Sequence, residues 1–151
     1  KEGFRSSAKF YNLKNADGFT DTYWGADLRY AAKVFKIEAE YMTKEMNDRE
    51  PGALSAMYIE GLCKVKVNNQ AISRIEPVLR WDAMGYDITD RGFGVNRVTA
   101  GANFVLKTGN CTSLFRVNYE HYFNNSMDMS ALFKTPQHNA DKFAIEYLLV
   151  F

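Results

Sequence analysis

An alternation of apolar and polar residues recurs in eight segments of this 151-residue chain and constrains its fold more than any other feature. A period of two is that of a β-strand, in which successive side chains point to opposite faces. Each segment is about 10 residues long, the length that a tilted strand needs to cross a bilayer. The segments are 4–13, 22–32, 34–45, 54–66, 72–84, 97–107, 113–123 and 141–151.

The composition agrees with a β-rich fold and excludes several other classes. Aromatic residues make up 15% of the chain, only three residues are Pro, and no apolar run is long enough for a membrane-spanning helix. The net charge of +1 gives no sign of a nucleic-acid-binding protein. The length suits a single domain over 1–151.

The lengths of the connections alternate between short and long. Short connections are expected at 32–33, 67–71 and 108–112, and long polar ones at 14–21, 46–53, 85–96 and 124–140. Membrane barrels have this asymmetry, with short turns on the periplasmic side and long loops outside. The sequence therefore predicts a transmembrane, antiparallel, up-and-down β-barrel with about eight strands in this chain.

The orientation of the two faces follows from the size of the apolar side chains. In 113–123, Val117 and Tyr119 alternate with Arg116, Asn118 and Glu120. A soluble barrel of the lipocalin kind would turn the charges to solvent and line a ligand cavity with the apolar row. Bulky Trp, Tyr and Phe occur in the apolar rows of nearly all segments, which is too much volume for such an interior. We therefore expect the apolar rows to face lipid.

Aromatic residues also fall at two levels of the predicted barrel, as the girdles of a membrane barrel do. The residues expected near the outer ends of the strands are Trp24, Tyr41, Trp81 and Phe123. Those expected near the inner ends are Tyr30, Phe35 and Phe151.

Charged residues on the opposite face are the candidates for a water-filled lumen. The main ones are Arg29, Lys36, Arg74, Arg80, Arg97, Arg116, Glu38, Glu76 and Glu120. Basic and acidic side chains nearly balance in these rows, and no dense ladder of Arg or Lys lies at one depth. We therefore expect ion pairs between neighbouring strands rather than an anion filter.

The last segment, ADKFAIEYLLVF, has Tyr147, Leu149 and Phe151 at alternate positions and ends in Phe. It is similar to the C-terminal assembly signal of bacterial outer-membrane barrels. The stretches GADLRYAAKVFKIEAEYM, SAMYIEG, RIEPVLRWDAMGYD and NRVTAGANFVLKTGNCTSLFRVNYEHYF resemble the C-terminal half of the phosphate-selective porin O and P family, in a form associated with Bacteroidetes.

This resemblance implies an outer-membrane porin that lets small hydrophilic solutes diffuse passively, with anions such as phosphate among them. It implies contacts with outer-membrane lipid and the barrel-assembly machinery, and association with further copies or other outer-membrane proteins. It also implies a larger barrel of around sixteen or more strands, of which this chain supplies about half. The start at KEGFR, without Met or a signal segment, fits either a truncated or a mature chain.

Two alternatives stay open at this point. Eight strands can close on themselves into a small barrel with a filled interior, which the chain length permits. The chain can also be an accessory or structural barrel subunit without an open channel, and inward-facing Tyr58, Tyr122 and Leu148 reduce the free bore.

Other chemistry has little support in the sequence. We expect no enzyme activity, no cofactor and no metal, because catalytic motifs are lacking and neither His121 nor His138 has a second ligand at zinc spacing. Asp87 and Asp90 lie in a loop that could hold calcium, although a plain polar loop is the simpler interpretation. Cys63 and Cys111 are expected on strands that are not neighbours and are therefore not expected to form a disulfide.

Overall fold

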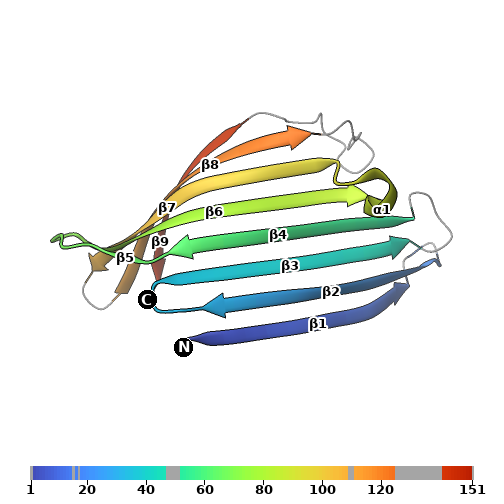
Figure 1. The fold of residues 1–151 in the computed structure, drawn as a ribbon, viewed down its shortest axis with the longest axis horizontal. Coiled ribbons are helices and arrows are strands. Elements are labelled where there is room, and N and C mark those ends of the chain that lie inside the picture. The colour runs from blue at the N-terminus through green and yellow to red at the C-terminus, as the bar shows by residue number, and fades with distance from the viewer. Residues whose placement is uncertain are drawn as a thin grey trace.

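The computed structural model describes residues 2–14, 16, 18–46, 52–108, 111–124 and 141–150. They form one antiparallel sheet in which each long strand pairs with the next along the chain (Figure 1). The strands are β1 (Gly3–Lys14), β2 (Thr20–Ala31), β3 (Phe35–Met46), β4 (Ala53–Cys63), β5 (Val65–Lys66), β6 (Ile72–Tyr86), β7 (Val95–Thr108), β8 (Cys111–Asn124) and β9 (Lys142–Val150). One short helix, α1 (Ile88–Arg91), lies between β6 and β7.

The all-β, up-and-down prediction is confirmed. The predicted segments match the strands to within one or two residues at their ends, apart from one segment that is divided. Segment 54–66 is divided into β4 and β5 at Lys64. The pairing with β6 keeps its register across this break, since Leu62 pairs with Val78 and Val65 with Ile75. The same register places Cys63, the last residue of β4, opposite Pro77 and Lys64 opposite Glu76. Pro77 has no N–H to donate to a neighbouring strand, and β4 ends beside it.

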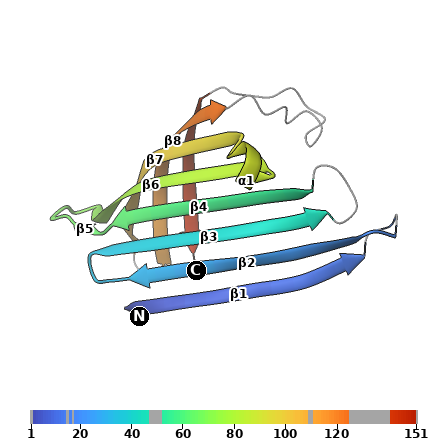
Figure 2. The same cartoon turned by 45° about the vertical axis from the view of Figure 1, so that its right-hand side comes forward.

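The sheet is curved but open. Figures 1 and 2 show the strands turning progressively from β1 to β9, as expected from the twist of β-sheets. Within the part of the chain that the structure describes, β1 contacts only β2, β9 contacts only β8, and the two edge strands do not contact each other. The eight long strands therefore do not form the small closed barrel that the chain length permits.

The sheet has no conventional hydrophobic core. Among the described residues, the only buried apolar side chains are Leu62 and Ala83. The buried polar residues outnumber them and include Asp21, Thr43, Ser55 and Ser113. Order along the sheet therefore depends on backbone ladders and contacts between side chains of neighbouring strands.

Helices contribute almost nothing to this architecture. Over the described ranges, no helix combines the length and the apolar character needed to cross a membrane.

Gly101 in β7 is required by the close approach of β8. A Cβ atom at this position would lie 2.5 Å from the carbonyl oxygen of Val117 and would collide with the side chain of Asn118. We expect Gly101→Ala to lower the free energy of unfolding by about 1–3 kcal/mol, since an added methyl group forces the backbone to shift. Urea unfolding of the refolded protein measures this loss. The control is Ala100→Val, a similar enlargement at an exposed neighbour on the opposite face; equal losses in both variants would contradict the prediction.

Candidate functional site

The charged candidates lie on one face of the sheet, which we call the polar face. The strand register places one charged or polar residue of each long strand directly opposite the next. This central row consists of Arg5, Arg29, Glu38, Glu60, Arg80, Thr99, Glu120 and Lys142. A single row across eight strands brings together residues that are far apart in the sequence.

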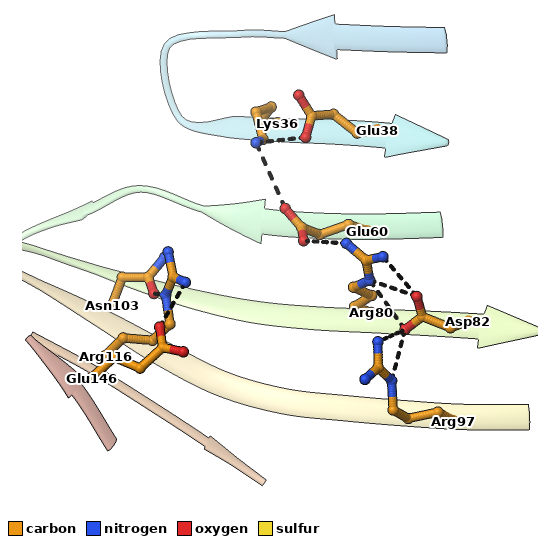
Figure 3. A network of polar contacts seen from close by, with 9 residues as sticks. All are labelled: Lys36, Glu38, Glu60, Arg80, Asp82, Arg97, Asn103, Arg116 and Glu146. Atoms are coloured by element: carbon orange, nitrogen blue, oxygen red, sulfur yellow. Dashed lines mark hydrogen bonds and ion pairs between the residues drawn. The ribbon is translucent and has the colours of Figure 1, made fainter. Parts of the chain in front are cut away.

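Ion pairs connect the central row from β2 to β6. Arg29 Nε lies 3.0 Å from a carboxylate oxygen of Glu38, whose other oxygen accepts a hydrogen bond of 2.8 Å from Lys36. The same ammonium group of Lys36 lies 3.6 Å from Glu60. Glu60 in turn lies 3.6 Å from Arg80 (Figure 3). The contacts cross three strand boundaries without interruption.

Asp82 joins two arginines from neighbouring strands. Arg80 donates to Asp82 at 2.6 Å through Nη2, and Arg97 donates to its other oxygen at 3.2 Å through Nε (Figure 3). Arg97 also lies 3.3 Å from Glu120 on β8. Asp82 is therefore the carboxylate that neutralises both guanidinium groups.

A second group of contacts lies nearer the short turns. Arg116 of β8 donates to Asn103 of β7 at 3.0 Å and pairs with Glu146 of β9 at 3.0 Å (Figure 3). On β6, Arg74 pairs with Glu76 at 2.6 Å along the same strand. The expected cross-strand pairing is thus present from β2 to β9.

Tyrosine rings support several of these cations. The guanidinium carbon of Arg80 lies 4.0 Å from the ring centroid of Tyr58, and that of Arg97 lies 6.0 Å from Tyr122. The ammonium of Lys142 lies 5.0 Å from the same Tyr122 ring. Cation–π contact of this kind favours the charged side chain lying along the wall rather than extending away from it.

All nine lumen candidates lie on the polar face and all nine take part in ion pairs. Sequence reasoning missed Asp21, which was assigned to a long connection. It is the second residue of β2, buried, and lies 3.0 Å from Lys44 of β3. Its separation from Asp27 and Arg29 by an even number of residues is the signal that would have placed it on this face.

The opposite face, which we call the apolar face, exposes its largest side chains. Leu79 is 62% exposed and Phe143 is 66% exposed, whereas the carboxylate side chains of Glu60 and Glu120 are each 20% exposed. This is the reverse of a sheet that buries its apolar side. The lower exposure of the charges indicates that the polar face is the inner side of the curve.

Two pairs of the aromatic residues predicted at the outer and inner levels contact each other on the apolar face. Trp24 and Tyr41 contact each other toward the long-loop end with ring centroids 5.2 Å apart. Tyr30 and Phe35 contact each other at the short-turn end at 5.5 Å. Phe151, the last residue expected in the inner level and in the assembly signal, lies outside the described residues; Tyr147 and Leu149 are exposed on β9.

Asp87, which the sequence offers as a calcium ligand, forms a hydrogen bond within the protein instead. Asp87, with a φ of 45°, accepts a hydrogen bond of 2.9 Å from the backbone N–H of Ala53 and so joins the start of β4 to α1. Within the described part of the chain, His, Cys, Asp and Glu form no group of three or more suited to a metal. Cys63 is an exposed free thiol, and His138 lies outside the described residues.

His121 contacts the carboxylate of Asp141, just before the start of β9. Asp141 accepts a hydrogen bond from the hydroxyl group of Tyr119 and lies 2.7 Å from Nδ1 of His121. The hydrogen bond from Tyr119, followed by that from His121, lowers the pKa of Asp141 below its ordinary value. This contact holds the start of β9 against β8.

The sequence matches no protein-family model, no curated protein and no solved structure.

Proposed function

We propose that this chain forms part of the wall of a porin in the bacterial outer membrane, through which small hydrophilic solutes diffuse passively. The observation that supports this proposal most directly is the exposure of the two faces. The most exposed side chains include Phe10, Phe143 and Leu79, each more than half exposed, while Glu60, Arg80, Arg97 and Glu120 of the polar face are paired and only 20–30% exposed. Lipid is the environment in which an outward apolar face is favourable.

The open edges support a barrel wider than eight strands. In a bilayer, unpaired N–H and C=O groups along a strand edge cost several kcal/mol each, so a membrane sheet must close. The outer edges of β1 and β9 have no partner strand among the described residues, and they do not approach each other. In the proposal, further strands lie between β1 and β9 and enclose the polar face. The assembly signal at Tyr147 and Leu149 would direct the barrel to the assembly machinery.

The pairing of charges on the polar face affects which solutes the proposed pore would prefer. Selectivity in a porin depends on the fixed charge that a solute meets in the lumen. Arg80 and Arg97 share Asp82, and each also approaches a glutamate, so these two neighbouring arginines present little uncompensated charge to an anion. The wall described here therefore favours general diffusion with weak ion preference over a phosphate filter.

Single-channel recording in a planar bilayer tests this function. We expect the full-length protein to give stable openings, and reversal potentials in a salt gradient to show weak ion preference. The control is the same preparation boiled before addition, which should give no openings. Strong anion preference would restore phosphate as the solute. A folded barrel that shifts its gel mobility on heating but conducts nothing would contradict the porin and favour an accessory subunit.

A further inference from the structure

The short-turn end of the sheet has a cluster of lysines without acidic partners. Lys33 lies in the turn between β2 and β3, Lys64 in the break between β4 and β5, Lys66 in β5, and Lys107 near the end of β7. None of the four forms an ion pair with a described residue, and residues 32–34, 64–71 and 107–108 contain no Asp or Glu. Lys66 is paired with Arg74 and therefore projects from the polar face. Lys33, which is exposed, and Lys64 are the lysines beside the turn between β2 and β3.

Two hydrogen bonds fix part of this cluster. Lys64 donates to the carbonyl oxygen of Ala32 at 3.2 Å, which brings its charge beside the turn that contains Lys33. Lys107 donates to the carbonyl oxygen of Asn69 at 2.6 Å. The neutral acceptors leave both ammonium charges uncompensated, so this end of the sheet attracts anions.

An apolar groove lies at the same end, across β3, β4 and β6. Its volume is about 710 Å³, within the range of ligand sites, and Lys64 lies among the residues that line it. Gly61 pairs with Ile37 on one side and Leu79 on the other, so a missing side chain separates two exposed apolar ones. A Cβ added at Gly61 would meet no atom within 4 Å.

The exposed walls of the groove belong to the apolar face. Ile37 and Leu79 project there, and Val34 and Val65 are exposed at the turn end, 60% and 48% respectively. The groove is therefore continuous with the surface that we assign to lipid, and it ends beside the lysines. An acyl chain with an anionic headgroup is the ligand whose two parts match these two features.

We propose that this groove and the lysine cluster bind an anionic phospholipid of the leaflet next to the short turns. One acyl chain lies in the groove over Gly61, and Lys33 and Lys64 bind the phosphate. The inference rests on the proposed membrane location, and deepens it by naming a lipid and its site. It makes no use of the polar face.

Native mass spectrometry of the full-length barrel in neutral detergent tests the site. We expect phosphatidylglycerol to bind more tightly than phosphatidylethanolamine of the same chain length. The double variant Lys33→Gln and Lys64→Gln should weaken phosphatidylglycerol binding by about fivefold for each lysine, since each cation near an anionic lipid surface contributes that much. Lys9→Gln removes the same charge from the polar face of β1 and should leave the binding unchanged.

Gly61→Leu tests the groove separately, because the open space at this position lets the variant fold. We expect it to weaken the binding of phosphatidylglycerol while the mobility shift on heating is retained. Unchanged binding in Gly61→Leu, equal binding of the two lipids, or full competition by inorganic phosphate would each overturn the inference. A barrel that inserts into vesicles but shows no lipid preference would contradict this inference alone. Failure to insert would contradict the proposed function as well.

Discussion

Replacing Ile59 by Arg is expected to destabilise the protein in a bilayer, whereas replacing Met42 by Arg is not. The two residues are on neighbouring strands and almost equally exposed, at 44% and 46%. Ile59 lies on the apolar face and Met42 on the polar face. An arginine facing lipid near the bilayer midplane costs about 2–4 kcal/mol, while one facing a water-filled lumen costs little.

Urea unfolding in lipid vesicles measures this difference between the two variants. The pair is matched in exposure and in the charge introduced, so only the face differs. In a soluble protein, both arginines would extend into water and both variants would unfold like the parent chain. Equal stability of the two variants in vesicles would therefore contradict the assignment of the apolar face to lipid.

Replacing Asp82 by Asn is expected to change both stability and ion preference. Asp82 neutralises Arg80 and Arg97, at 2.6 Å and 3.1 Å. Loss of one partner of a fully buried pair costs about 3–5 kcal/mol. These side chains are 22–30% exposed, and we therefore expect a smaller loss of about 1–2 kcal/mol in the free energy of unfolding.

The same substitution leaves two arginines without their carboxylate and should shift the reversal potential toward anion preference. Glu40→Gln is the matched control, because Glu40, Tyr58 and Asp82 lie directly opposite one another on β3, β4 and β6. Glu40 forms no ion pair with a described residue. It should therefore give a smaller shift and no loss of stability. Equal effects of both variants would show that Asp82 does not neutralise the charge of Arg80 and Arg97 more than Glu40 does.

Much of the sheet could be predicted because its signal is local. Alternation within each segment is enough to assign Val117 and Tyr119 to one face and Arg116 and Glu120 to the other. Connection lengths then require antiparallel neighbours in chain order. The same reasoning placed all nine lumen candidates on one face, where the structure has them.

The predictions that were wrong concern the exact ends of strands and the effect of one strand on the next. Asp21 was missed because a strand's first residues look like loop in the sequence, although β2 begins at Thr20. The interruption at Lys64 follows Cys63, which lies opposite Pro77, a residue of the next long strand. This interruption is not encoded within the affected segment.

Periodicity and residue chemistry thus determine which side chains share a face, since a strand allows only two directions. The partners on that face are decided by register. Asp82 reaches Arg97 because β6 and β7 pair with these two residues opposite each other. A shift by two residues would keep both faces and change the ion pairs between the strands. The openness of the sheet is likewise a tertiary property, because curvature accumulates over all the strands and no single segment contains it.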